Sequence, residues 1–430
     1  MPPQSKTRFV WLICSIAALG GLLFGYDWVV IGGAKPFYER YFNLTSQNAI
    51  GWANSCALLG CLAGSIASGV LSDRWGRKKV LILSAFLFAV SSVLTGWAPT
   101  FTWFVVWRIT GGAAIGMASN VSPMYIAEVS PAELRGRMVS LNQLTIVIGI
   151  LVAQIANWLI ARPVPEGATG EFIRQSWNGQ YGWRWMFTAV AIPSVIFFVG
   201  ACCIPESPRW LARSAEPKTG VTPWRALLVP RLRKVLGIGI VLAVLQQWSG
   251  INVIFNYAEE IYRDAGYDVN GILFNIVITG AINLVCTLIA LGVVDRFGRR
   301  ALMLTGCAGI AVSHGLLGLA YYFKLNGLPV LVLTLCTIGC YAMSLAPVTW
   351  VIISEIFPNR IRGLAVSVAV SALWVACFLL TFTFPLLNAA LGPAGTFWLY
   401  AAICATGFFF ILARVPETKG KTLEEIEASW

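Results

Sequence analysis

Long apolar runs, separated by short polar stretches, dominate the pattern along this chain. A helix that crosses a membrane needs about 20 mostly apolar residues. The sequence contains twelve such runs, and the polar stretches between them carry most of the charge. The pattern therefore predicts an all-α membrane protein with twelve transmembrane helices, beginning near Phe9, Ile50, Val80, Phe101, Met138, Arg184, Val235, Gly271, Ala301, Leu328, Gly363 and Thr396.

The distribution of charge supports this interpretation. Of 430 residues, 57% are hydrophobic and only 12% are charged, which is more apolar than an ordinary soluble protein. The first run extends well past the apolar core of a signal peptide and has no small-residue cleavage site before Asp27, so we interpret it as the first transmembrane helix. The net charge of +12 alone would suggest a nucleic-acid partner. Most Lys and Arg, however, fall in alternate loops and at both ends, a positive-inside bias that predicts cytoplasmic termini and argues against nucleic acid.

Metal and disulfide chemistry are not expected. All 11 cysteines lie within apolar runs, and the chain has a single histidine, His314, among small and apolar residues. A lone histidine cannot build a metal site, and cysteines inside apolar runs are typical of packing residues. We therefore predict no metal and no cofactor, and interpret His314 as a packing residue.

An internal repeat divides the chain. Asp-Arg-Trp-Gly-Arg at residues 73–77 returns as Asp-Arg-Phe-Gly-Arg at residues 295–299, and Pro-Glu-Ser-Pro-Arg-Trp at 205–210 has its counterpart in Pro-Glu-Thr-Lys-Gly at 416–420. A third pair sets a glutamate seven residues before an Arg-Gly, with Glu128 and Arg135 in one half and Glu355 and Arg362 in the other. The repeat predicts a six-helix bundle over residues 1–212, a short cytoplasmic linker over 213–234, and a second six-helix bundle over 235–430.

Together these motifs resemble the sugar porter family of the major facilitator superfamily, and the resemblance covers nearly the whole chain. It implies two bundles that rock around a site held between them, a location in the plasma (inner) membrane, and an inner gate of paired charges. The alternative is that these charges only mark topology and flank helices. The resemblance assigns to the gate Asp73, Arg77, Glu128, Arg135, Glu206, Arg209, Asp295, Arg299, Glu355, Arg362 and Glu417.

Two charges inside predicted helices suggest proton coupling. Asp27 lies in the outer half of the first helix, and Arg108 lies at comparable depth in the fourth. Because a buried carboxylate prefers to be protonated while a nearby arginine favours its charged form, a change in their separation would bind or release a proton. The alternative is a permanent ion pair that joins the two helices. Proton-coupled sugar porters are similar at both positions, although their accessory glutamate is Val190 here.

Amides and aromatic residues suggest a sugar site. Amide side chains both donate and accept hydrogen bonds, as sugar hydroxyls require, and aromatic rings pack against sugar C–H surfaces. Local unwinding at Gly250 would let the amides of the seventh helix converge; simple interhelical bonding is the alternative. Phe24 is a further candidate for an aromatic ring that packs against the sugar. The resemblance implies that Gln143, Gln246, Gln247, Asn252, Asn283, Trp350 and Trp374 bind the sugar. Departures from the family pattern at Trp28, Ile150, Asn256, Leu373 and Cys377 leave the identity of the sugar open.

The sequence therefore predicts a monomeric secondary transporter that carries a monosaccharide, a hexose or a pentose, together with a proton by alternating access. The first alternative is a facilitative uniporter of the same fold, which Asp27 argues against. A non-transporting sugar receptor would usually carry a long cytoplasmic tail, and a drug or organic-acid carrier would not need uncharged amides. A membrane-embedded enzyme is disfavoured because no metal-ligand cluster or phosphate-binding loop is found.

Overall fold

The chain folds entirely into helices and connecting turns over the residues described, which are 3–131, 134–165, 167–214, 230–325, 327–357, 362–417 and 419 of a computed structural model. No strand occurs among these residues. The first half comprises α1 (Pro3–Tyr41), α2 (Gln47–Trp75), α3 (Arg77–Gly96), α4 (Phe101–Val129), α5 (Arg135–Ile160), α6 (Gly170–Gln175), a π-helical turn (Asn178–Gly182), α7 (Trp183–Thr188), α8 (Ala191–Cys203) and α9 (Pro208–Ser214).

The second half begins with α10 at Pro230, within the predicted linker, most of which lies outside the described residues. Two long helices are interrupted here, one between α10 and α11 and one at Ser344 between α15 and α16. The elements are α10 (Pro230–Trp248), α11 (Ile251–Asn256), α12 (Ala258–Asp264), α13 (Val269–Phe297), α14 (Arg299–Tyr322), α15 (Leu328–Met343), α16 (Leu345–Glu355) and α17 (Arg362–Arg414).

The predicted number of twelve transmembrane helices is confirmed. Ten helical stretches in the described part of the chain are long and apolar enough to cross a membrane. One of them, Ala365–Arg414, contains Gly392 in a non-helical conformation followed by Pro393, so it consists of two spans. α4 adds a further span: it has 29 residues and carries Arg108 in its interior.

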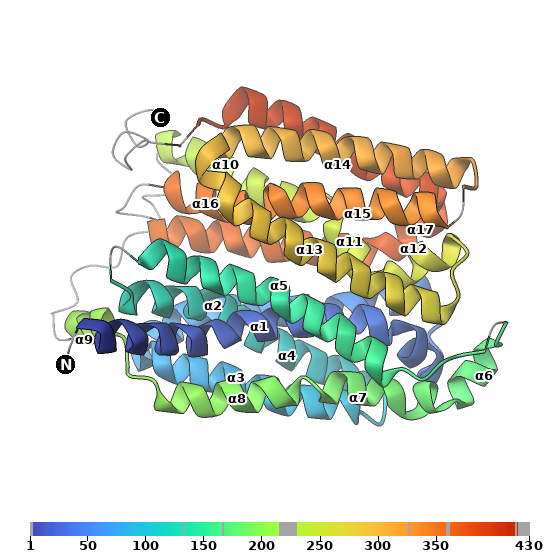
Figure 1. The fold of residues 1–430 in the computed structure, drawn as a ribbon, viewed down its shortest axis with the longest axis horizontal. Helices are drawn as coiled ribbons and strands as arrows, with labels where there is room; N and C mark the ends of the chain where they lie inside the picture. The colour runs from blue at the N-terminus through green and yellow to red at the C-terminus, as the bar shows by residue number, and fades with distance from the viewer. Residues whose placement is uncertain are drawn as a thin grey trace. The chain divides into compact units, whose positions relative to one another are not determined.

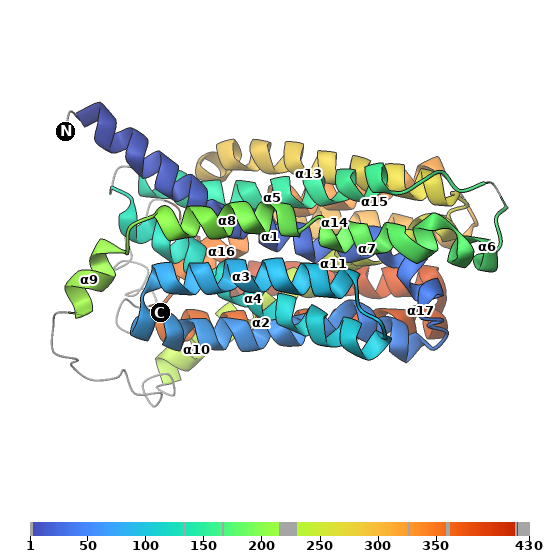
Figure 2. The ribbon, with the colours of Figure 1, turned by 90° about the horizontal axis from the view of Figure 1, so that it is seen from below.

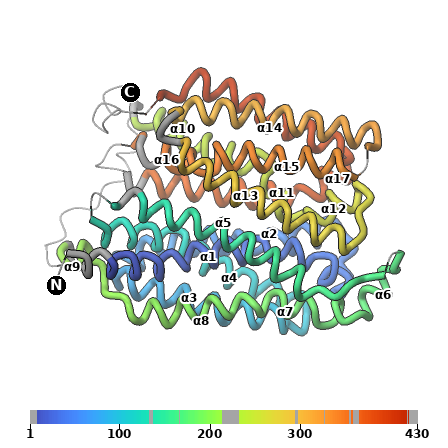
Figure 3. Tube along the Cα trace, viewed as in Figure 1, coloured from blue at the N-terminus to red at the C-terminus, as the bar shows by residue number. Residues whose placement is uncertain are grey.

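The chain divides into two compact units. Unit 1 contains Met1–Lys218 with Asp268–Gly280, and unit 2 contains Thr219–Tyr267 with Ala281–Trp430. Within unit 1, α1 packs against α5 and α2 against α4, and α3 lies beside α8 (Figures 1 and 2). Within unit 2, α14 packs against α17 and α15 (Figure 3). The first turns of α13 thus cluster with unit 1, whereas the predicted boundaries assigned the whole helix to the second bundle.

Glycines bring the helices of unit 1 into close contact. A Cβ atom on Gly112 of α4 would lie 1.9 Å from the carbonyl oxygen of Ala57 on α2, and one on Gly25 of α1 would lie 1.9 Å from that of Ile146 on α5. Only a residue without a side chain fits at such crossings, and close backbone packing is what associates helices in a lipid environment, where burial of apolar surface gives no advantage.

The sequence repeat corresponds to a repeated turn. Gly76 has φ 95° and ψ 165°, and Gly298 has φ 91° and ψ 153°, a conformation that favours glycine. In unit 1 the carboxylate of Glu206 accepts hydrogen bonds from the first backbone N–H groups of α3, and in unit 2 the carboxylate of Glu417 does the same for α14. Both glutamates therefore satisfy helix N-terminal donors and complement the helix dipole. We call the end of each unit that carries this glycine the turn end.

Candidate functional site

A buried ion pair joins α1 to α4 in unit 1. Nη1 of Arg108 lies 3.1 Å from both carboxylate oxygens of Asp27. Asp27 is 4% and Arg108 3% exposed. The structure thus brings together the two charges that the sequence placed at similar depth. Isolated charges at this depth are costly, and the contact gives each of these side chains a partner of opposite charge.

An aromatic ring and a glycine lie beside this ion pair. The guanidinium of Arg108 lies 5.4 Å from the ring centroid of Phe187, and its Nε has no hydrogen-bond partner in the described part of the chain. Gly111 leaves space beside the carboxylate, since a Cβ there would lie 3.7 Å from Oδ2 of Asp27 and 3.1 Å from Oγ of Ser91. The ion pair is therefore the main polar contact of both side chains among the described residues.

An aromatic cluster covers the pair on the side away from the turn end. Phe104 stacks on Tyr38 with ring centroids 5.2 Å apart and meets Phe187 edge-on at 5.6 Å. Farther along, the guanidinium of Arg184 lies 4.5 Å from the ring of Trp183, and its Nη1 donates to the carbonyl of Gly96 at 2.8 Å. The sequence analysis did not identify this cluster, because its members are spread over α1, α3, α4 and α7.

In unit 2, three amide side chains form a directed chain of hydrogen bonds. Asn252 donates from Nδ2 to Oε1 of Gln247. Gln247 donates from Nε2 to Oε1 of Gln246 at 3.3 Å. Gln246 in turn donates to the carbonyl oxygens of Leu345 and Ala346, at 3.1 and 3.2 Å. Because backbone carbonyls only accept, they fix the direction of the whole chain.

The break between α10 and α11 makes this chain possible. α10 ends at Trp248, Gly250 has φ 87° and ψ −2° in the left-handed region, and α11 starts at Ile251. In an unbroken helix residues five apart point about 140° away from each other. The reversal at Gly250 removes that divergence, so that Asn252 reaches Gln247. The sequence predicted unwinding at this glycine.

Two contacts from α17 support the amide chain. Cys377 accepts a hydrogen bond from Nδ2 of Asn252 at 3.3 Å, and Trp248 donates from Nε1 to the carbonyl of Ala376 at 2.9 Å. Cys377 was noted in the sequence only as a departure from the family pattern. The role of Trp248 was missed, because its partner is 128 residues away along the chain.

The other residues that the sequence predicted to bind sugar lie on several helices. Asn283 is 5% exposed, Trp374 is 3% exposed and Trp350 is 37% exposed, all in unit 2. In unit 1, Gln143 and Phe24 are half-buried, and Phe24 meets Trp28 edge-on with centroids 6.2 Å apart. The position of Trp374 well inside the protein agrees with a wall rather than a membrane-interface anchor.

The residues predicted to form the gate in the first half make a compact cluster at the turn end of unit 1. The side chain of Arg77, 5% exposed, binds Glu128 at 3.1 Å and Asp73 at 3.2 Å. Ser207 donates to Glu128, and Glu206 caps α3 as described above. These contacts are therefore made inside one unit. Arg209, which was also predicted to belong to the gate, is exposed.

The matching cluster of unit 2 is described only in part. Glu417 accepts from the backbone N–H groups of Arg299 and Arg300, at 3.0 and 3.1 Å. The side chains of four further predicted gate residues lie outside the described part of the structure; these are Arg135, Asp295, Glu355 and Arg362.

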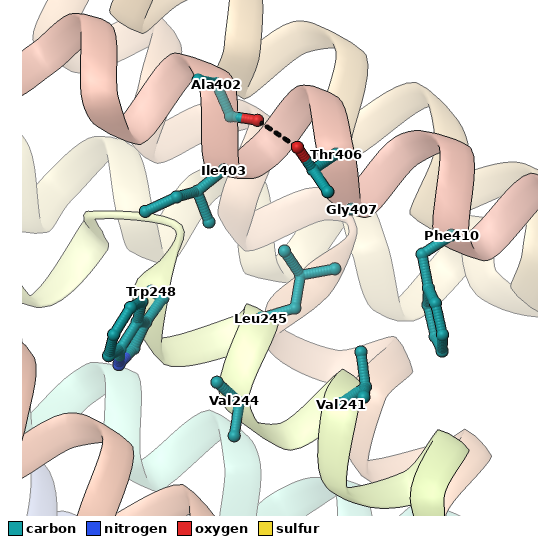
Figure 4. A pocket seen from close by; sticks show the side chains of 9 residues that line it. All are labelled: Val241, Val244, Leu245, Trp248, Ala402, Ile403, Thr406, Gly407 and Phe410. Carbon is teal, nitrogen blue, oxygen red and sulfur yellow. Dashed lines mark hydrogen bonds between the residues drawn. The ribbon is translucent and has the colours of Figure 1, made fainter.

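An apolar groove of about 350 Å³ lies between α10 and the last part of α17 in unit 2 (Figure 4). The hydroxyl of Thr406 donates to the carbonyl of Ala402 within its own helix. Its two polar side chains, Trp248 and Thr406, already donate to backbone carbonyls and the rest of its lining is apolar, so the groove is poorly suited to a sugar. Its lining residues are Val241, Val244, Leu245, Trp248, Ala402, Ile403, Thr406, Gly407 and Phe410.

Comparison with known proteins assigns the chain to a family. The family model for sugar (and other) transporters matches residues 13–222 and 213–430. The chain is 39% identical to the glucose transport protein of Synechocystis, with 99% of each chain covered, and 36% identical to the D-xylose-proton symporter of Escherichia coli, with 100% and 97% covered. A solved structure of the xylose transporter of E. coli in an inward-open conformation matches with a TM-score of 0.83 at 36% identity, covering 98% of this chain and 100% of the other.

The sequence-based resemblance is thereby confirmed, and with it the integral membrane location. The chain carries solutes rather than catalysing a reaction, as its relatives do. The protein therefore belongs to the sugar transporter family of the major facilitator superfamily.

Proposed function

We propose that this protein is a proton-coupled monosaccharide symporter that works by alternating access. The observation that carries the proposal is the ion pair between Asp27 and Arg108, buried in unit 1 of a chain whose unit 2 contains the amide chain. Relatives named as proton symporters of D-xylose, arabinose and galactose support it, with 33–37% identity. Their different sugars leave the choice between hexose and pentose to experiment.

The coupling step takes place at the carboxylate. A proton that binds Asp27 converts the carboxylate to a neutral acid and removes the attraction that holds Arg108. Release of the proton restores both charges and the ion pair. Because the pair ties α1 to α4, each protonation state favours a different packing of these two helices, so binding and release of the proton shift the balance between the two packings.

The sugar is bound by the amides. Gln246, Gln247 and Asn252 supply N–H donors and carbonyl acceptors, Asn283 and Gln143 supply further amides, and Trp350, Trp374 and Phe24 supply the aromatic walls. A sugar hydroxyl can replace a hydrogen bond between two of these amides, because each hydroxyl both donates and accepts. The charged cluster around Arg77 and its counterpart near Glu417 act as the inner gate.

We further propose that the turn ends face the cytoplasm, that both termini lie on that side of the plasma membrane, and that the protein acts as a monomer. The concentration of Lys and Arg at the turn ends supports the orientation. Reporter fusions that are active on one side of the membrane only, placed after Trp430, test it. A reporter active outside the cell would overturn this orientation.

The function is tested in proteoliposomes that contain a pH-sensitive dye. A panel of hexoses and pentoses is added outside, and sugar-driven acidification of the interior is recorded. We expect one or a few sugars to drive proton entry, and Asp27→Asn to abolish it while sugar exchange across the membrane continues. Glu171→Gln is the matched control, since Glu171 on α6 is exposed and contacts only its near neighbours Arg174 and Gln175 among the described residues. Proton uptake that survives in Asp27→Asn would contradict the coupling role, and sugar flux without proton movement in the unmodified protein would indicate a facilitative uniporter.

A further inference from the structure

The carbonyl of Ser249 loses its helical partner at the break between α10 and α11. In a continuous helix this oxygen would accept from the backbone N–H four residues on, that of Val253. Here Val253 donates to the carbonyl of Gly250 instead, at 3.1 Å. An unpaired carbonyl in a membrane-buried segment is costly, so the break is stable only if another donor is supplied.

His314 supplies that donor. Its Nε2 lies 2.9 Å from the oxygen of Ser249, and the ring is fully buried. Because a carbonyl can only accept, the hydrogen must sit on Nε2. The Nδ1 atom has no hydrogen-bond partner among the described residues, which agrees with this tautomer. Cys404 approaches the same oxygen more weakly, with its sulfur at 3.8 Å.

The imidazole ring is itself held in place by aromatic neighbours. It stacks on Phe397 with centroids 5.5 Å apart and planes 28° apart, and Tyr400 lies 6.0 Å away. Both rings come from α17, so three helices meet at this carbonyl. The fit is close: a Cβ on Gly250 would lie 3.0 Å from Nε2 of His314 and 3.1 Å from Tyr400.

We propose that His314 is a positioning residue for the sugar site: its hydrogen bond to Ser249 stabilises the break that turns Asn252 back toward Gln247. The inference rests on the proposed sugar-binding role of that amide chain. His314 makes no hydrogen bond to the three amides in the described structure and acts through the backbone of residues 249 and 250. Its donor is needed to hold Asn252 in the directed chain, while the Asp27–Arg108 pair in unit 1 does not depend on it.

Three substitutions separate the hydrogen bond from the volume of the ring. Glutamine places its amide nitrogen where Nε2 of histidine stands, asparagine places it near Nδ1, and leucine offers no donor. We therefore expect His314→Gln to bind sugar almost as well as the unmodified protein, and His314→Leu and His314→Asn to raise the dissociation constant about tenfold, as expected when a buried carbonyl loses its donor. The pH profile of binding, which reports on Asp27, should not change in any of them.

Dissociation constants are measured by equilibrium binding of the transported sugar to detergent-purified protein, with thermal unfolding recorded in parallel. Unchanged affinity in His314→Leu would overturn the proposal, and so would equal loss in all three variants, which would indicate ring packing alone. Gln246→Ala is measured beside them. If it weakens binding and His314→Leu does not, only the role of His314 fails; if Gln246→Ala has no effect, the sugar site itself is wrongly assigned.

A second measurement does not depend on any variant. Since His314 is the only histidine in the chain, ¹⁵N-histidine labelling gives the signals of one imidazole. We expect the tautomer with hydrogen on Nε2. A ring that carries its hydrogen on Nδ1 alone cannot donate to Ser249, and this result would overturn the proposal even if the leucine variant does not fold.

Discussion

Asn252 donates a hydrogen bond to Gln247, although the two residues would face different directions on a regular helix. The contact exists because Gly250 adopts a left-handed conformation between them. This single backbone reversal brings Asn252 of α11 to Gln247 of α10, and so connects it to the pair formed by Gln247 and Gln246. The predictions below concern this group, the ion pair of unit 1 and the close helix crossing beside it.

Gly250→Ala should destabilise the protein by about 1–2 kcal/mol, because a side chain is strained in the left-handed region, and should also weaken sugar binding. The new methyl group would press against His314 and Tyr400. Gly237→Ala, in the preceding helix α10 and with nothing within 4 Å of the new Cβ, is the control and should weaken neither property. Thermal unfolding and equilibrium sugar binding are the measurements. Equal behaviour of the two variants would show that the reversal at Gly250 is not required.

Gln246→Ala should raise the dissociation constant of the sugar about tenfold, through loss of hydrogen bonds of the usual strength. Gln246→Glu should be worse, since a carboxylate cannot donate to the carbonyls of Leu345 and Ala346 and would repel them. Gln175→Ala, at an exposed glutamine on α6, serves as the control. A glutamate variant that binds better than the alanine variant would contradict the direction assigned to the amide chain.

Arg108→Gln should reduce stability by about 3–5 kcal/mol, because it leaves the carboxylate of Asp27 buried without its partner. In the double variant Asp27→Asn with Arg108→Gln, much of that loss should be recovered, since neither charge remains. Chemical or thermal unfolding of the single and double variants in detergent measures the difference. If the double variant is as unstable as Arg108→Gln alone, the two side chains are not energetically coupled.

Gly112→Ala should force α2 and α4 apart and cost about 1–3 kcal/mol, the usual range for overpacking a tight interior. The added carbon would stand 1.9 Å from a backbone oxygen, which cannot move aside as a side-chain tip can. At Gly69 of α2 the same change meets nothing within 4 Å, and alanine should be neutral or stabilising there because it favours helix. Comparable unfolding temperatures for the two variants would refute the close crossing.

Much of the fold could be predicted from the sequence because it is set by local composition. The apolar runs gave helix starts that agree with the structure within a few residues at Ile50, Phe101 and Leu328. The sequence repeat likewise anticipated the equivalent turns at Gly76 and Gly298, because the motif and the conformation it requires lie in the same few residues.

The candidate site was predictable only where a single helix carries the information. The pairing of Asp27 with Arg108 followed from depth in the membrane, and the unwinding near Asn252 followed from a glycine in its own segment. The partners of Gln246 are 99 and 100 residues away, and periodicity does not show which carbonyl an amide will meet. For the same reason His314 looked like a packing residue, since its acceptor is 65 residues away.

The fixed direction of the amide chain also restricts which chemical groups can bind between its members. A group inserted between Gln247 and Gln246 must take a hydrogen from one neighbour and give one to the other, because the backbone of Leu345 anchors the chain at its far end. A hydroxyl satisfies both requirements, whereas fluorine satisfies only one. In a series of sugars, each hydroxyl in turn can be replaced by fluorine. The loss of affinity at each position would therefore show where the site requires a sugar hydroxyl that donates as well as accepts.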